Sequence, residues 1–184
     1  MKLSANFDSK EFRCPCQDCR GIEPLVAPEL VSNLEKLRAI LNADLKPEEA
    51  EHGLTVNSGC RCPAKNKLEG GAKASQHLYD PKTGKTARGA DVWCTTRRTR
   101  EVYESALTIP GFKGIGVGPP QAPVAEDKAK SIPGRPGKPG YVHLDVRLVL
   151  TRVQWGYGAG GRHVALAAVL PKLDDWNPLA PVEV

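Results

Sequence analysis

The chain has 184 residues, of which 40% are hydrophobic, and it carries a formal net charge of +5. This length fits one hydrophobic core, so residues 1–184 are expected to form a single domain. The sequence has no block of like charges, no signal-peptide core and no apolar run of membrane-spanning length, which argues against nucleic-acid and membrane binding and predicts synthesis in the cytoplasm.

The apolar pattern predicts two helices and five short strands. Apolar side chains recur at helical spacing in 28–41, where Pro28 suits the first turn, and again in 96–108. Strands are expected at 54–59, 88–94, 112–118, 140–150 and 153–157. This order predicts an α+β fold, in which helices pack on one side of a small antiparallel sheet.

One stretch of the chain is expected to be irregular. Residues 119–139 contain six prolines and show no periodicity. Such a composition is typical of an extended excursion within a domain rather than of a second folded unit.

The strand expected at 140–150 has two different faces. Period-two alternation directs Val142, Leu144 and Val146 toward the core. The opposite face carries Tyr141, His143, Asp145 and Arg147. We interpret this polar face as the wall of a groove; a solvated surface with one hydrogen-bonded histidine is the alternative.

Three residues far apart in the sequence form a candidate metal site. His77, Asp91 and His143 each stand at the edge of a short apolar run. Two imidazoles and one carboxylate are a set that zinc accepts with a fourth position left for water, which is typical of catalytic zinc. Taken singly, His77 is more typical of a surface loop and Asp91 of a strand end, so the hypothesis depends on all three.

Five segments share their order and main residue types with one enzyme family. These segments are NFDSKEFRCPC, ELVSNLEKLRAIL, LTVNSGCRCPAKN, GGAKASQH followed by RGADV, and YVHLDVR followed by VQW. Across about residues 6–157 they resemble the zinc D-alanyl-D-alanine carboxypeptidases and murein endopeptidases, which share their fold with lysostaphin-type peptidases and the hedgehog signalling domain. The resemblance implies that fold, a zinc cofactor and a peptidoglycan peptide as substrate.

The resemblance also implies the zinc ligands, because His77, Asp91 and His143 match the ligand positions of the family motifs. Close relatives have six residues between the first histidine and the aspartate. Here 79–86 is additional, and its turn-forming residues predict a β-hairpin that returns the chain to nearly the same point.

Other motif positions imply substrate contacts. Arg61 matches an arginine near the substrate carboxylate or peptide carbonyl, a role that suits a guanidinium because it binds carboxylates bidentately. A salt bridge within the loop is its alternative role. Ser75, Gln76 and Tyr141 are expected to line the substrate site, although Ser75 could equally cap its loop.

The catalytic base is the main departure from the family pattern. Many relatives have an acidic residue where this chain has Gly140. Asp145 is the first candidate for the base, but it could instead orient a zinc ligand or Arg147. Glu126 and Asp127, in the proline-rich excursion, are the other candidates.

The six cysteines allow several interpretations. Cys14, Cys19, Cys60 and Cys62 could bind a second, structural zinc ion if the N-terminal segment lies over the turn that contains the CRC sequence. Two disulfides or free buried thiols are the alternatives.

The expected function is zinc-dependent hydrolysis of peptidoglycan stem or cross-link peptides that contain D-amino acids. A phage or prophage endolysin fits a chain without a signal peptide, which would reach the cell wall after release and act as a monomer. The alternative is a non-catalytic zinc-containing binding module or phage structural component with the same fold.

Overall fold

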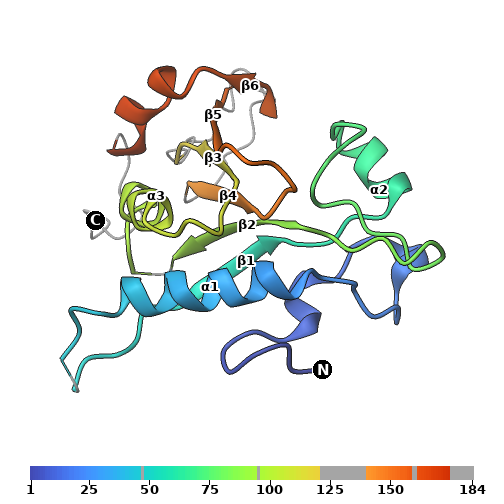
Figure 1. Ribbon diagram of the computed structural model, residues 1–184, viewed down its shortest axis with the longest axis horizontal. Helices are drawn as coiled ribbons and strands as arrows, with labels where there is room; N and C mark the ends of the chain where they lie inside the picture. The colour runs from blue at the N-terminus through green and yellow to red at the C-terminus, as the bar shows by residue number, and fades with distance from the viewer. Residues whose placement is uncertain (47, 95, 121–139, 159–160, 175–184) are drawn as a thin grey trace, which may run out of the picture.

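The computed structural model describes residues 1–46, 48–94, 96–120, 140–158 and 161–174 (Figure 1). Nearly all of the proline-rich excursion therefore falls outside the described residues, and with it Glu126 and Asp127. No helix in the described ranges has both the length and the apolar character needed to cross a membrane.

A six-stranded sheet lies at the centre of the molecule, with strands in the order β1-β2-β4-β3-β5-β6. The strands are β1 (Leu54–Ser58), β2 (Gly89–Cys94), β3 (Gly114–Gly118), β4 (Tyr141–Asp145), β5 (Val153–Tyr157) and β6 (His163–Val164). The α-helices are α1 (Pro28–Leu41), α2 (Pro63–Leu68) and α3 (Thr99–Leu107). Short 3-10 helices are η1 (Ser9–Phe12), η2 (Gln17–Cys19), η5 (Leu166–Ala168) and η6 (Leu170–Asp174).

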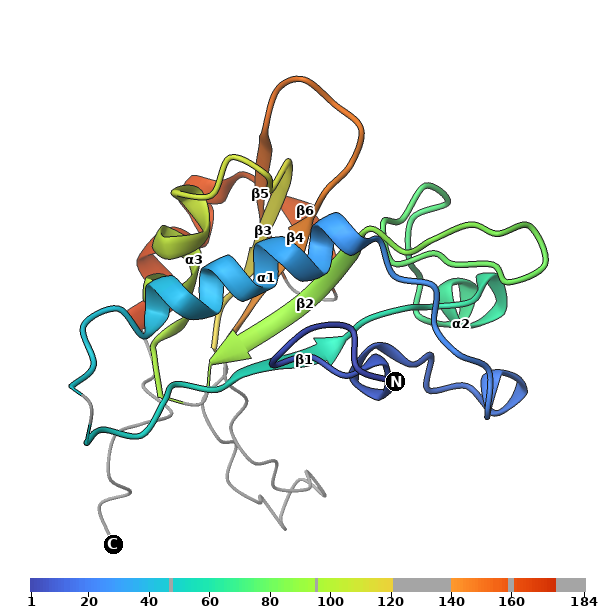
Figure 2. The same cartoon turned by 60° about the horizontal axis from the view of Figure 1, so that its bottom comes forward.

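The predicted α+β class is confirmed, and the sheet is antiparallel with one exception. Neighbouring strands run antiparallel except β3 and β5, which pair in parallel. The chain passes through β4 and a loop between these two strands, so β5 can enter the sheet in the same direction as β3 (Figure 2).

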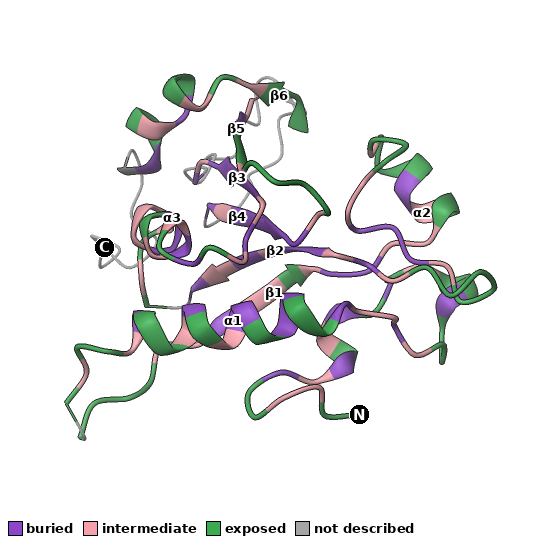
Figure 3. Ribbon diagram, in the orientation of Figure 1, coloured by how far each residue is buried: buried purple, intermediate pink, exposed green. Residues whose placement is uncertain are grey.

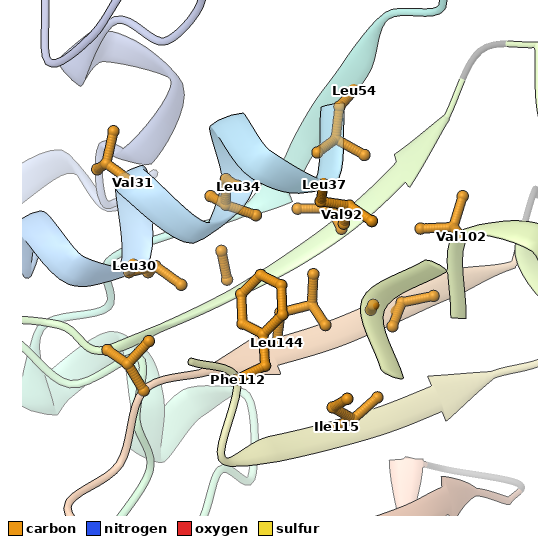
Figure 4. Packing of buried hydrophobic residues seen from close by; sticks show 14 of the residues in the cluster. Leu30, Val31, Leu34, Leu37, Leu54, Val92, Val102, Phe112, Ile115 and Leu144 are labelled. Atoms are coloured by element: carbon orange, nitrogen blue, oxygen red, sulfur yellow. The ribbon is translucent and has the colours of Figure 1, made fainter. Parts of the chain in front are cut away.

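The hydrophobic core lies between the sheet and helices α1 and α3. Leu30, Leu34 and Leu37 follow one face of α1 and are fully buried, as the helical spacing predicts. They lie beside Val92 of β2 and Leu144 of β4 (Figure 4). Burial of each leucine stabilises the fold by about 2 kcal/mol, which fixes α1 against the sheet. Burial is concentrated on this inner side of α1 and on the central strands (Figure 3).

The strand predicted at 140–150 is shorter than expected, because β4 ends at Asp145. The backbone N–H of Arg147 donates to the Asp145 carboxylate at 3.1 Å, and this side-chain bond turns the chain out of the sheet. The predicted hairpin is present, with paired backbone hydrogen bonds between Asp80 and Lys85 and a positive φ of 72° at Gly84.

Candidate active site

Sheet register brings two of the candidate ligands together. Asp91 of β2 lies directly opposite His143 of β4 in the antiparallel ladder. Side chains alternate along strands, so both point to the sheet face opposite α1, while Val92 and Leu144 point into the core. The predicted two-faced character of this strand is therefore observed.

The third candidate comes from a loop that is tied to the sheet by backbone bonds. The N–H of Arg61 donates to the carbonyl of His77 at 2.8 Å, and the N–H of Tyr79 donates back to the carbonyl of Arg61 at 3.1 Å. The N–H groups of Arg88 and Gly89 donate to the carbonyl of Gln76. These bonds hold the imidazole of His77 over β2 and β4.

The three side chains converge with the spacing that one zinc ion requires. Nε2 of His77 lies 3.0 Å from Nδ1 of His143 and 3.3 Å from Oδ1 of Asp91, and Nδ1 of His143 lies 2.8 Å from the same oxygen. Tetrahedral zinc with ligand bonds of about 2.1 Å needs donor atoms about 3.4 Å apart. The three donor atoms therefore fit zinc once the distances between them increase slightly.

Hydrogen bonds on the far side of each ring orient the two imidazoles. Nδ1 of His77 lies 2.8 Å from the carbonyl of Gly59, and Nε2 of His143 lies 3.1 Å from Oδ2 of Asp145. A carbonyl and a carboxylate only accept, so each of these ring nitrogens carries the proton. The remaining nitrogens face Asp91, where a bound metal would displace the proton that Nδ1 of His143 shares with the Asp91 carboxylate.

Asp145 does not occupy the position of a general base, which corrects the first choice made from the sequence. Its side chain is fully buried, and its carboxylate accepts bonds from His143 and from Nε of Arg147 at 2.8 Å. Because these partners occupy both oxygens on the side away from the ligand atoms, Asp145 orients His143. That alternative role is the one the geometry supports.

The charges of the buried cluster are coupled. Burial by itself would raise the pKa of the Asp91 carboxyl, but the two adjacent imidazoles lower it well below its usual range. Burial lowers the pKa of His77. Burial would also lower the pKa of His143, yet its bonds to Asp145 and Asp91 raise it to about 9. The cluster therefore favours a positive charge between the carboxylates of Asp91 and Asp145, and a bound metal cation would supply that charge.

The ligand atoms open into a pocket of about 790 Å³. Arg61, Ser75, Gln76 and Tyr141, the residues predicted to contact substrate, all line it. Nη2 of Arg61 lies 3.5 Å from Asp91, and its buried Nε has no hydrogen-bond partner among the described residues. The hydroxyl of Ser75 accepts the N–H of His77 at 3.3 Å, so Ser75 also caps its loop.

Comparison with known protein families gives a match. The chain matches the family model described as Peptidase M15 over residues 5–122. The chain belongs to the Peptidase M15 family. Members of this family are zinc peptidases, and the membership supports metallopeptidase activity on a peptide substrate. Neither the curated proteins nor the solved structures give a match.

The matched region contains His77 and Asp91 but ends before β4. The place of His143 in the candidate ligand set therefore rests on the motif resemblance of its own segment and on its contacts with Asp91 and His77.

Sequence reasoning missed an aromatic wall in the pocket. Trp155 and Tyr157 of β5 and His163 of β6 line it, and the Trp155 ring lies 5.3 Å from the His143 ring and 5.1 Å from the His163 ring. Alternation along β5 could have revealed the first two, since positions 155 and 157 share a strand face.

Glycines of β3 make room for this wall. A Cβ at Gly116 would stand 2.6 Å from the Trp155 ring, and one at Gly118 would stand 2.2 Å from the Tyr141 ring. A Cβ at Gly114 would stand 2.2 Å from the carboxylate of Asp145. The Gly-Ile-Gly-Val-Gly pattern of β3 therefore gives apolar side chains to the core and space to the site.

The cysteine set predicted from the sequence needs one correction. The structure brings together the sulfur atoms of Cys14, Cys16, Cys19 and Cys62, all within 4.8 Å of one another. Cys60 is not in this cluster, because its thiol lies buried 3.7 Å from the carbonyl of Leu25. All six cysteines are free, so the disulfide alternative is not observed.

Proposed function

We propose that this M15 chain hydrolyses peptidoglycan stem or cross-link peptides that contain D-amino acids. The observation that carries the proposal is the convergence of His77, Asp91 and His143 at the floor of a pocket. Both imidazoles are oriented by hydrogen bonds on their outer side, and among the described residues no fourth histidine, cysteine or carboxylate joins the group. This arrangement supports a catalytic rather than a structural zinc site.

His77, Asp91 and His143 would hold a zinc ion, which would supply Lewis-acid chemistry and a water of lowered pKa at this position. The protein supplies orientation and charge around it. Asp145 and Arg147 fix the ring of His143 from behind. Arg61 presents a guanidinium, 16% exposed on its side chain, to the pocket, where it binds the carboxylate or the peptide carbonyl of the substrate.

The pocket wall suits a short peptide with small side chains. Tyr141, Trp155 and Tyr157 provide flat apolar surfaces against which the methyl groups of alanine residues pack. The net charge of +5 favours approach to an anionic cell wall. In this proposal the protein is a phage or prophage endolysin that reaches the wall after release.

His163 is our candidate for the proton acceptor. It lines the same pocket as His143 and stacks on Trp155, and it is not part of the ligand set. Burial and the positive charges of His143 and Arg147 lower its pKa, so the ring is neutral near pH 7 and can accept a proton. Glu69, the pocket-lining carboxylate outside the ligand set, already pairs with Lys65 at 2.6 Å.

A non-catalytic zinc module is the second candidate. It is favoured by Gly140, which stands where many relatives have an acid, and by the burial of Asp145. Such a protein would bind zinc and a wall peptide without cleaving it.

Digestion of purified peptidoglycan separates the two candidates. Mass spectrometry of the released muropeptides should show new peptide termini that disappear with a chelator and return with zinc. His52→Ala is the matched control, because this histidine contacts Thr96 and does not line the pocket. Retention of zinc with no new termini on any wall preparation would leave the binding module as the function.

A further inference from the structure

The cysteine cluster joins two segments that are distant in the sequence. Cys14, Cys16 and Cys19 lie in the N-terminal segment around η2, and Cys62 is the N-cap residue of α2. Figures 1 and 2 both place this segment and α2 at the same end of the molecule. Cys14 and Cys19 are buried, and the other two are partly exposed.

The sulfur atoms have the spacing of metal ligands. Sγ of Cys16 lies 3.5 Å from Sγ of Cys14 and 3.5 Å from Sγ of Cys62. Tetrahedral zinc with zinc–sulfur bonds of about 2.3 Å separates its sulfurs by about 3.8 Å. A disulfide needs about 2.05 Å between two sulfurs and would use them only in pairs. One ion accounts for the convergence of all four, whereas disulfides do not.

Two backbone N–H groups point to sulfur atoms of the cluster, as backbone N–H groups do at thiolates. The N–H of Cys62 points to Sγ of Cys14 at 3.5 Å, and the N–H of Lys65 points to Sγ of Cys62 at 3.4 Å. These contacts stabilise negative charge on sulfur, which a metal ligand must carry.

We propose that Cys14, Cys16, Cys19 and Cys62 bind a structural zinc ion. Binding replaces four S–H bonds by four zinc–sulfur bonds and releases four protons, without oxidation or reduction. Because all four positions are filled by protein, the ion has no open site for water and takes no part in hydrolysis. It is separate from the ion proposed for His77, Asp91 and His143.

This ion would position one wall of the active site. Cys62 directly follows Arg61, and Pro15, between two of the cysteines, lines the same pocket as Arg61. Fixing Cys62 to the N-terminal segment therefore fixes the backbone that carries the guanidinium.

The test uses the double variant His77→Ala/His143→Ala, which removes the proposed catalytic site and isolates the cysteine cluster. Elemental analysis should find one equivalent of zinc in this variant and two in the wild type. After exchange for cobalt, the variant should show the intense thiolate-to-cobalt charge-transfer absorption of a tetrahedral four-sulfur site. Adding Cys16→Ser should remove both signals, whereas adding Cys60→Ala, the matched buried cysteine outside the cluster, should keep them.

The proposal is overturned if the double variant contains no zinc, if its cobalt form lacks the charge-transfer absorption, or if mass spectrometry of unreduced protein shows disulfides among the four cysteines. Should Cys16→Ser fail to fold, the cobalt spectrum of the double variant alone decides. Because that variant lacks the proposed catalytic ligands, its result does not depend on whether the chain is a peptidase.

Discussion

The two candidate metal-binding clusters of this chain are built in different ways. The His–Asp–His cluster rests on β2 and β4, at the centre of the sheet, and opens into a pocket. The cysteine cluster lies between η2 and the short helix α2, outside the sheet. A sheet can hold three ligands in place for chemistry, whereas an ion in the cysteine cluster would link the N-terminal segment to α2.

The largest effect should come from removing a ligand of the sheet cluster. In His143→Ala the pocket loses one donor to zinc, so we expect hydrolysis of peptidoglycan to fall to background. The cysteine cluster should keep its zinc, which elemental analysis would show as one remaining equivalent. Activity close to that of His52→Ala would show that the sheet cluster is not the catalytic centre.

Replacement of the candidate proton acceptor should have the next largest effect. His163→Gln keeps a similar shape without a basic nitrogen, and we expect kcat to fall about 10²–10⁴-fold, the range for loss of general-base catalysis. KM and the zinc content should change little, because His163 is outside the ligand set. An unchanged kcat would assign the proton transfer to another group.

Replacement of Asp145, the carboxylate that orients His143, should have a smaller effect on zinc binding and activity. Asp145→Asn keeps the shape but weakens the bonds to His143 and Arg147, so zinc affinity or activity should fall about 10–100-fold. Competition with a chromophoric chelator measures the affinity. Glu104→Gln, on the exposed side of α3, is the control and should match the wild type. If both variants behave alike, the bond behind His143 does not tune the metal.

The smallest effect should come from filling the space that the β3 glycines leave for the aromatic side chains of the pocket wall. Gly116→Ala places a methyl group 2.6 Å from Trp155 and should cost about 1–3 kcal/mol of unfolding free energy, measured with urea. In a Trp155→Ala background the same change should cost less, because the contact is gone. An equal cost in both backgrounds would contradict the packing described for β3 and β5.

Much of the fold could be predicted from local pattern. Helix α1 has the predicted bounds because Pro28 starts it and its leucines follow one face, and β5 is also as predicted. The end of β4 could not be predicted, since it depends on a bond between the Asp145 carboxylate and the Arg147 backbone. The parallel placement of β5 depends on long-range pairing, which alternation does not encode.

The candidate ligands of the sheet cluster were named from sequence because their residue types and a family resemblance agree, and the structure brings all three together. Their roles as zinc ligands stay a prediction. The role of Asp145 depends on which side of His143 it contacts, and the exchange of Cys60 for Cys16 depends on a buried contact with Leu25. Neither contact leaves a signal in residue spacing.

The most direct test of the account is anomalous diffraction at the zinc absorption edge from crystals of the zinc-loaded protein. We expect one anomalous peak bonded to Nε2 of His77, Nδ1 of His143 and a carboxylate oxygen of Asp91, on the pocket side of the sheet. A zinc-loaded crystal with no peak among these three atoms would contradict the central claim.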